Sequence, residues 1–282
     1  MANYLRPTTI KACLDMMEGD YVFMAGGTDL MVEVRKEPEL LERNVIDLTF
    51  IPELREIRLR EGFLEIGAAA SHDDIVTSPL VQKEFKILAE ACRTIGSPQI
   101  RNRGTLGGSI GTASPASDTL PALLLGDCQV RIVNVSGKEH QVSLQEFMLK
   151  PGKIQLEKDE LMVSFLVRPL AGIPARFLKV GRRKALAISR LNFALALELA
   201  RDKVVGDVRI AVGAALPVAS RFQEVEDMLQ GKVLDRELAE AAADAIRDRI
   251  LAVTGMRKSS EYKLPVVRDL IIRMLVEMGG IQ

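Results

Sequence analysis

Apolar and polar residues alternate with two different periods along this chain, and the period changes at turns rich in glycine and proline. Residues 21–24 form a short apolar run that predicts a buried strand, and residues 44–48 predict a second one. Residues 30–34 between them have helical spacing, and another short helix is expected over 8–17. A strand, a helix and a strand in this order predict a small βαβ unit at the start of the chain.

The middle of the chain predicts hairpins separated by helices. One hairpin is expected from residues 54–57 and 63–67, and another from residues 129–135 and 140–144 around a Ser-Gly-Lys turn. A helix start with an exposed His72 is expected at 71–74. Further elements follow in chain order: helices over 79–95 and 119–125, and a strand over 160–167.

The last third of the chain changes from strands to helices. Strands are predicted over 176–180, 191–199 and 204–212, and helices over 221–229, 235–253 and 265–278. Strands followed by helices indicate an α+β arrangement. We therefore predict domains at 1–170, with parts at about 1–55 and 56–170, and at 171–282.

Composition excludes several functional classes. Lys+Arg and Asp+Glu both number 38, and Trp is absent, so neither net charge nor aromatic content favours a nucleic-acid partner. No apolar run reaches the roughly 20 residues of a membrane span. Three isolated cysteines form no obvious disulfide set and suit a reducing compartment, so we expect a cytoplasmic protein. The cysteines, Cys13, Cys92 and Cys128, and the histidines, His72 and His140, have no metal-ligand spacing, so no metal site is predicted.

The most distinctive segment is the glycine-rich stretch from residue 101 to residue 118, RNRGTLGGSIGTASPASD. Main-chain N–H groups and hydroxyls there are able to converge on an anion, and Asp118 closes the stretch. The pattern matches neither a P-loop nor a Rossmann fingerprint. An ordinary tight connection remains an alternative interpretation of this stretch alone.

A second glycine pair lies at 25–30, AGGTDL, between the first predicted strand and its helix. A strand, a double-glycine turn and a helix start form an anion-binding arrangement. A plain strand–helix turn capped by Thr28 or Asp29 is the alternative.

With both segments in place, the chain resembles the FAD-binding medium subunits of the molybdenum hydroxylases, the xanthine, nicotinate and aerobic CO dehydrogenase family. The resemblance covers nearly the whole chain, and the motifs that carry it are AGGTDL, IGSPQIRNRGTLGGSI with ASPASD, DELM, and FLKVGRRKALAISRLN. It implies an FAD-binding domain of the vanillyl-alcohol-oxidase (PCMH) type, made of two α/β subdomains. An α+β domain of antiparallel sheet and helices would follow it.

The resemblance also implies which residues contact FAD, bound non-covalently. They are Met24, Ala25, Gly26, Gly27, Thr28, Asp29, Leu30, Gly96, Thr105, Leu106, Gly107, Gly108, Ser109, Thr112, Asp118, Leu161 and Lys179. No catalytic acid, base or nucleophile is among them.

The resemblance also implies roles for these residues, and their chemistry fits those roles. N–H groups at Gly26, Gly27, Thr28, Gly107 and Gly108 would hold the diphosphate. The carboxylate of Asp118 would accept from a sugar-chain hydroxyl, Leu161 would form an apolar wall, and Lys179 would place a cation near the flavin ring. Ser109 replaces the family's usual Asn and has one donor fewer, while Lys263 replaces an Arg at a surface or subunit-contact position.

By resemblance, the function is electron transfer inside a complex. Electrons would arrive from [2Fe–2S] clusters on a small partner subunit, next to a large subunit with the molybdenum cofactor, and leave from the flavin to NAD⁺ or another acceptor. Two alternatives are a free-standing flavin-dependent NADH reductase and an assembly protein without FAD. The basic cluster Arg182-Arg183-Lys184 is expected to serve an acidic partner, a nucleotide phosphate or neither.

Overall fold

The computed structural model describes residues 3–281 and divides into two compact units. The N-terminal unit comprises residues 1–114 and 127–169, and the C-terminal unit comprises residues 115–126 and 170–282. The N-terminal unit is thus interrupted by twelve residues that pack with the C-terminal unit. The order of elements in the sequence did not indicate that residues 115–126 belong to the C-terminal unit. The predicted domain division at residue 170 stays a prediction.

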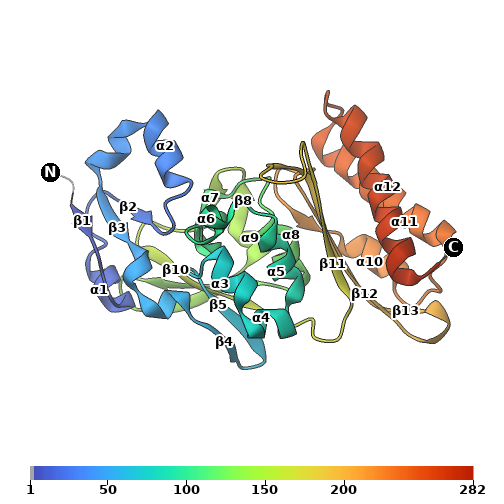
Figure 1. Ribbon diagram of the computed structural model, residues 1–282, viewed down its shortest axis with the longest axis horizontal. Coiled ribbons are helices and arrows are strands. Elements are labelled where there is room, and N and C mark those ends of the chain that lie inside the picture. Colours follow the sequence, from blue (N-terminus) through green and yellow to red (C-terminus); the bar gives the residue numbers. More distant parts are fainter. Residues whose placement is uncertain (1–2, 282) are drawn as a thin grey trace. The chain divides into compact units, whose positions relative to one another are not determined.

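The N-terminal unit begins with a parallel three-stranded sheet in the order β1-β3-β2 (Figure 1). The predicted βαβ unit is confirmed, since β2 and β3 are parallel and a helix connects them. The elements of this part are β1 (Tyr4–Leu5), α1 (Ile10–Asp15), β2 (Tyr21–Met24), α2 (Leu30–Lys36), η1 (Pro38–Glu42), β3 (Asn44–Asp47), η2 (Leu48–Phe50) and η3 (Pro52–Arg55).

A five-stranded antiparallel sheet, in the order β4-β5-β10-β6-β7, forms the rest of this unit together with short helices. Both predicted hairpins are present in it, but the first strand of the first hairpin lies at 57–60 and not at the predicted 54–57, because residues 52–55 form the 3-10 helix η3. Its strands are β4 (Ile57–Arg60), β5 (Phe63–Gly67), β6 (Gln129–Asn134), β7 (Glu139–Ser143) and β10 (Glu160–Val167), and a separate pair is β8 (Met148–Lys150) with β9 (Lys153–Ile154). Its helices are α3 (His72–Thr77), α4 (Pro79–Glu84), α5 (Lys86–Arg93), α6 (Pro98–Arg101), α7 (Leu106–Thr112) and α9 (Leu144–Phe147).

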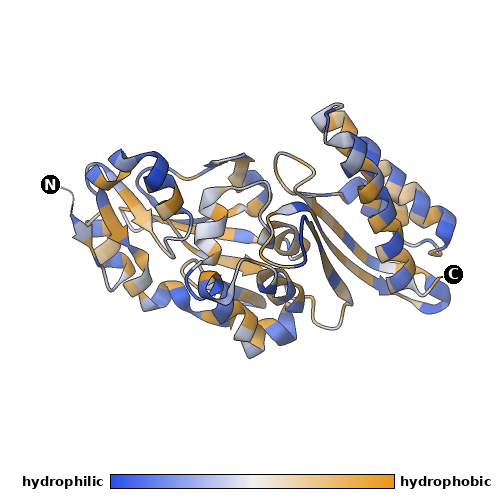
Figure 2. Ribbon diagram, turned by 45° about the horizontal axis from the view of Figure 1, so that its top comes forward, coloured by the Kyte–Doolittle hydropathy of each residue, from blue (hydrophilic) through white to orange (hydrophobic). Residues whose placement is uncertain are grey.

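The C-terminal unit is an antiparallel sheet, β11-β12-β13-β14, with helices packed on it, which confirms the predicted α+β arrangement. Its elements are α8 (Thr119–Leu125), β11 (Ala175–Gly181), β12 (Ser189–Leu199), η4 (Arg201–Lys203), β13 (Val205–Gly213), β14 (Ser220–Arg221), α10 (Gln223–Leu229), α11 (Arg236–Thr254) and α12 (Ser260–Gly279). Alternate residues of β12 and β13 share a core with one stripe of α11 and α12. Both helices accordingly carry hydrophilic as well as hydrophobic positions (Figure 2).

Three further predicted elements differ from the structure for identifiable reasons. The helix expected over 79–95 breaks at Phe85, whose backbone (φ −151°, ψ 51°) is not helical while its ring is fully buried. The last helix begins at Ser260 rather than at Pro265, so the proline lies inside it and removes one backbone donor. The glycine-rich stretch, expected to be a loop, contains helix α7.

A buried carboxylate ties the strands of the five-stranded sheet together. Glu65 on β5 accepts from Ser164 Oγ (2.7 Å), from Arg58 Nε (2.9 Å) and pairs with Arg131 Nη2 (3.0 Å). Burial opposes the charged form, but the hydrogen bonds of Ser164 and Arg58 and the charge of Arg131 outweigh it, so the pKa of Glu65 lies below its usual range. The ionised carboxylate therefore stabilises the folded state.

We predict that Glu65→Gln lowers the free energy of unfolding by about 1.5–3 kcal/mol at pH 7, the usual range for hydrogen bonds to a charged group. Because the folded-state pKa is lowered, this contribution is present above the unfolded pKa of about 4.3 and is lost as the pH falls through the folded value. Urea unfolding of both proteins at pH 7 and below pH 4 measures it. Glu139→Gln, which removes an exposed partner of Arg131, is the control and should cost under about 1 kcal/mol. If the loss in free energy of unfolding caused by Glu65→Gln were the same at both pH values, the prediction would be contradicted.

Candidate functional site

The first glycine loop connects the end of β2 to α2 and presents unpaired main-chain donors. Gly27 has φ +75°, the left-handed conformation that glycine adopts without strain. Within the described residues, no protein acceptor meets the N–H groups of Gly26, Gly27 or Thr28. Half-buried N–H groups without partners are uncommon, because their desolvation is costly. This turn therefore offers neighbouring donors to an anion.

The second glycine loop is fixed by hydrogen bonds to the segment that follows β5. The N–H of Leu106 donates to Ala70 O (3.0 Å) and the N–H of Gly107 to Ala68 O (2.8 Å). Thr105 then caps α7, because its Oγ1 accepts from the N–H of Gly108 at 3.0 Å. The loop is a docked helix start and not a flexible connection.

The structure brings the two loops into direct contact within the N-terminal unit. A Cβ added to Gly26 would lie 2.0 Å from the carbonyl oxygen of Arg103, so only glycine permits this approach. Thr112 Oγ1 donates to Asp29 Oδ2 at 3.1 Å and links α7 to the first loop. The predicted residues of both loops therefore surround one region.

The expected set of diphosphate donors needs a correction. The N–H groups of Gly107 and Gly108 already donate to Ala68 O and Thr105 Oγ1, so they are not free for a ligand. Gly107 is buried, and a Cβ there would lie 2.6 Å from Ala68 O. Its glycine is required by packing. The available main-chain donors are those of Gly26, Gly27 and Thr28.

Two further predicted positions lie on elements that flank the second loop. Gly96 has φ +45° in the turn between α5 and α6, and its carbonyl accepts from Arg101 Nη1 at 3.4 Å. Ser109 lies in the first turn of α7, where its N–H donates to Thr105 O at 3.0 Å. The contribution of each to a ligand stays a prediction.

Arg103 was missed by the sequence interpretation, which placed no cation in either loop. Its main chain packs on Gly26, and its charge is close enough to lower the pKa of Tyr4, although the hydrogen bond to Asp47 raises that pKa overall. Its position two residues before the capping Thr105 was the available signal. Arg103 is therefore an exposed cation beside the first loop.

Leu161 lies in the core of the N-terminal unit. Its side chain is 1% exposed on β10 and belongs to the core cluster that includes Ile46, Leu54 and Val163. The alternation of β10 turns this side chain into the core, and the role of Leu161 as an apolar wall stays a prediction.

Asp118 and Lys179 both lie in the C-terminal unit, and they pair with each other. Lys179 Nζ donates to Asp118 Oδ2 at 2.5 Å, while Ser189 Oγ (2.5 Å) and Asn192 Nδ2 (3.0 Å) donate to Oδ1. Asp118 is thus a buried carboxylate whose two oxygens already accept from protein donors, and not a free acceptor. The charge of Lys179 is balanced by this pair, and its placement near a flavin ring stays a prediction.

Asn192 holds this cluster at the centre of the sheet. It is fully buried, its Nδ2 also donates to Ser117 O (3.0 Å), and its Oδ1 has no partner among the described residues. A Cβ at Gly213, its neighbour on β13, would lie 2.2 Å from that Oδ1. Glycine at 213 is therefore needed for Asn192 to reach Asp118 and Ser117.

His72 is buried, not exposed as expected, and Cys92 Sγ lies 3.6 Å from its Nδ1. Burial, with a smaller effect of Arg101, lowers the pKa of His72 to about 4, so the ring is neutral at pH 7. Burial also raises the pKa of the Cys13 thiol to about 12. Among residues 3–281, no group of His, Cys, Asp or Glu is arranged to hold a metal ion.

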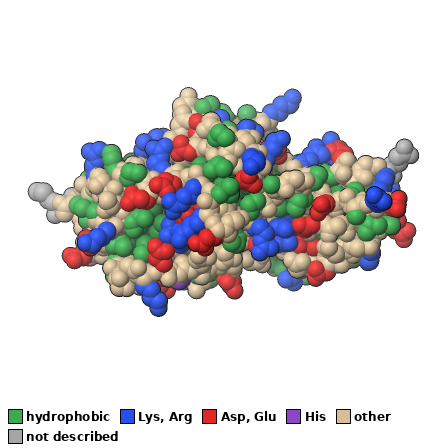
Figure 3. Space-filling view, turned by 90° about the horizontal axis from the view of Figure 1, so that it is seen from below, with side chains coloured by type: hydrophobic (Ala, Val, Ile, Leu, Met, Phe, Trp, Pro, Cys, Tyr) green, Lys and Arg blue, Asp and Glu red, His purple; other side chains and the backbone are tan. Residues whose placement is uncertain are grey.

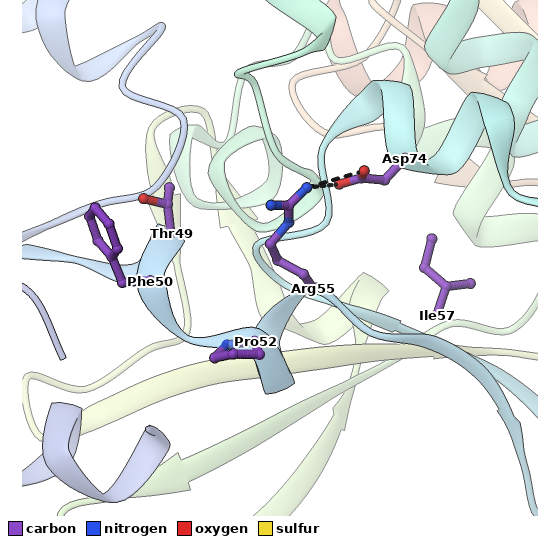
Figure 4. A pocket seen from close by; sticks show the side chains of 6 residues that line it. All are labelled: Thr49, Phe50, Pro52, Arg55, Ile57 and Asp74. Atoms are coloured by element: carbon purple, nitrogen blue, oxygen red, sulfur yellow. Dashed lines mark hydrogen bonds and ion pairs between the residues drawn. The ribbon is translucent and has the colours of Figure 1, made fainter. Parts of the chain in front are cut away.

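A surface cavity of about 510 Å³ lies elsewhere on the N-terminal unit (Figure 4). Arg55 points towards Asp74 there and donates to both carboxylate oxygens, at 3.2 and 3.0 Å, so its charge is balanced. Neither glycine loop contributes to the lining, which consists of Thr49, Phe50, Pro52, Arg55, Ile57 and Asp74.

Acidic and basic side chains are interspersed on the face seen in Figure 3, which agrees with a formal net charge of zero. None of the described helices is both long and apolar enough to span a bilayer.

Two family models match the chain. Residues 1–169 match the FAD binding domain in molybdopterin dehydrogenase, and residues 176–278 match the CO dehydrogenase flavoprotein C-terminal domain. The two matches together confirm the expected fold class.

Individual relatives agree with these matches. The chain is 31% identical to the nicotinate dehydrogenase FAD-subunit of Eubacterium barkeri, over 90% of this chain and 87% of that protein. It is 32% identical to the nicotine 6-hydroxylase medium subunit of Paenarthrobacter nicotinovorans, over 99% and 97%. A solved structure of carbon monoxide dehydrogenase from Hydrogenophaga pseudoflava, lacking the Mo-pyranopterin moiety of the molybdenum cofactor, superposes with a TM-score of 0.85 at 27% identity and 96% and 95% coverage.

The packing of Gly107 leads to a stability prediction that needs no ligand. Gly107→Ala should lower the free energy of unfolding by about 1–3 kcal/mol, the usual cost of overpacking, because the new Cβ would meet Ala68 O. Gly111→Ala in the same helix is the matched control, since its Cβ would meet only Met162 Cε at 3.5 Å. Alanine there should raise stability by up to about 1 kcal/mol through helix propensity. Calorimetry of both FAD-free variants decides the matter, and equal melting temperatures would refute the packing role.

Proposed function

Because this chain belongs to the family of FAD-binding domains of molybdopterin dehydrogenases, we propose that it is the electron-transfer subunit of a molybdenum hydroxylase complex. In this proposal it binds FAD non-covalently, receives electrons from [2Fe–2S] clusters of a partner subunit, and delivers them to NAD⁺ or another acceptor. FAD supplies the capacity to exchange electrons singly or in pairs. The residues of this chain bind and orient the cofactor and set its surroundings.

The observation that carries the proposal is the group of unpaired N–H donors at Gly26, Gly27 and Thr28, where the two glycine loops meet. Oriented main-chain dipoles of this kind hold diphosphates without requiring a lysine. The hydroxyl of Thr28 has no partner in the described chain and adds one donor, while Arg103 adds a nearby positive charge. The donor set therefore fits the diphosphate of FAD.

The buried cluster of Asp118, Lys179, Ser189 and Asn192 has a positioning role in this proposal. The resemblance puts Asp118 and Lys179 beside the flavin, and the structure holds both in one hydrogen-bonded group. A charge-balanced lysine stabilises negative charge less than an isolated one does. The surroundings of the flavin would accordingly be set by the ion pair and not by Lys179 alone.

The sequence has too few cysteines to hold an iron–sulfur cluster of its own, which is why the proposal includes partner subunits. It contains three cysteines, fewer than the four that a [2Fe–2S] cluster of the usual kind requires. The relatives are named as an FAD-subunit and a medium subunit, which are parts of larger enzymes. We place the molybdenum cofactor on a large partner subunit and the iron–sulfur clusters on a small one.

We predict that the purified protein contains about one FAD per chain, and that acid precipitation releases the flavin into the supernatant. The reason is that neither residues 24–30 nor residues 105–112 include a His or Cys able to bond the flavin covalently. Absorbance of supernatant and pellet measures the release. A colourless protein that takes up no added FAD would refute the proposed function, and flavin retained in the pellet would refute non-covalent attachment only.

We also predict that Thr28→Val weakens FAD binding about tenfold, the equivalent of roughly 1.4 kcal/mol for one lost hydrogen bond. Valine keeps the shape of threonine and removes only the hydroxyl. Titration of the FAD-free protein, followed by quenching of flavin fluorescence, gives the dissociation constant. Thr254→Val, at the end of α11 in the C-terminal unit, is the control and should bind FAD like the wild type. Unchanged affinity in Thr28→Val would remove Thr28 from the site.

A further inference from the structure

A concentration of positive charge lies at one end of the C-terminal unit. We define the hairpin surface as residues 182–188 between β11 and β12, Arg190, and residues 256–263 around the start of α12. It contains Arg182, Lys184, Arg190, Arg257 and Lys258, all exposed, and Glu261 is the only acid in these segments. The chain as a whole has no net charge, so this is a local excess.

Two interactions join Arg190, which directly follows the hairpin and Ser189, to the start of α12. The guanidinium carbon of Arg190 is 5.3 Å from the ring centroid of Tyr262. Lys263, whose Nζ donates to Ala214 O at 2.6 Å, has a pKa below its usual range because of burial and because Arg190 and Arg257 are close. The charges of Arg190, Arg257 and Lys263 therefore act on one another.

These cations lack the counter-ions that many arginines of the unit have. Arg221 pairs with Glu226 (2.8 Å), Arg268 with Asp244 (2.7 Å) and Arg273 with Glu277 (2.6 Å). Among residues 3–281, no carboxylate lies within ion-pair distance of any of the five exposed cations of the hairpin surface. Like charges gathered without counter-ions repel, and an acidic partner would relieve that repulsion.

Apolar side chains are exposed among these charges. Ile188 is 81% exposed, Met256 70% and Leu186 53%. A single exposed apolar residue needs no explanation, but several beside Arg and Tyr match the composition of protein interfaces. Salt-dependent attraction and apolar contact are thus available in the same place.

The hairpin is held in one shape before any partner binds. Arg183 Nε and Nη2 donate to Leu186 O at 3.2 and 2.5 Å, and Nε also donates to Ala185 O at 3.0 Å. Leu186 adopts φ +55°, which a non-glycine residue rarely does. Arg183 therefore folds the loop, and the charges free for a partner are those of Arg182 and Lys184. A pre-formed loop loses less entropy on binding.

We propose that the hairpin surface docks an acidic, partly apolar face of a partner subunit in the complex. The inference rests on the proposed function, since it requires partner subunits. It assigns the surface to a protein and not to a nucleotide. The exposed side chains of Ile188, Leu186 and Met256 would find no apolar surface to contact on a phosphate.

Charge reversal tests the inference. Arg182→Glu/Lys184→Glu is co-expressed with the molybdenum and iron–sulfur subunits, and the assembled fraction is measured by size-exclusion chromatography at low and high salt. We expect at least tenfold weaker assembly, with about one FAD per chain retained. Ile188→Ser should weaken assembly without the salt dependence, because it removes apolar contact only.

The matched control is Arg201→Glu/Lys232→Glu, which changes the charge equally at the opposite end of β12. Eleven strand residues separate the two ends, roughly 35 Å at the usual rise per residue. This variant should assemble like the wild type.

Each other outcome overturns the inference. Equal weakening by both charge reversals would show a general charge effect. Intact assembly with a raised KM for NADH would assign the surface to the nucleotide, and no change in either would make it ordinary surface. If the wild-type chain binds FAD but does not assemble, the proposed function fails and the inference fails with it.

Discussion

The contact between the main chains at Gly26 and Arg103 is the constraint on which the candidate site depends. A Cβ at Gly26 would lie 2.0 Å from the Arg103 carbonyl oxygen, so the two loops meet only while residue 26 is glycine. The second loop is held at that distance by hydrogen bonds to Ala68 and Ala70, which follow β5. One side of the site is thus rigid, and it leaves the first loop with the unpaired donors.

The same two loops show which parts of the site were predictable. The order of strand, glycine pair and helix at 21–34 predicted the first loop correctly, because hydrophobic periodicity and turn chemistry are local. The sequence alone also drew attention to the glycine-rich stretch of the second loop, but its glycines were interpreted as open main chain. In the structure Gly107 is glycine because it packs on Ala68, and its N–H is already used. A sequence does not distinguish a glycine that faces a ligand from one that faces another segment.

Long-range packing accounts for the other differences. Residues 115–126 follow the second loop directly in the chain, yet they pack on the sheet of the C-terminal unit. Asp118 accepts there from Lys179, Ser189 and Asn192, residues more than sixty positions away. His72, predicted to be exposed from its place at a helix start, is buried beside Cys92. Hydrophobic periodicity predicts the helices that contain these residues, but it does not reveal which other part of the chain packs on each helix.

A balanced total charge conceals how that charge is distributed. Ion pairs tie most arginines of α11 and α12 to neighbouring acids, and such pairs are recognisable from helical spacing. The three adjacent cations of the β11–β12 hairpin look alike in the sequence, yet they differ in the structure. The guanidinium of Arg183 donates hydrogen bonds to main-chain carbonyls of its own loop, whereas Arg182 and Lys184 are exposed without such bonds in the described chain. The shape that Arg183 imposes places their charges beside Leu186 and Ile188, so that one arginine determines what its two neighbours are able to bind.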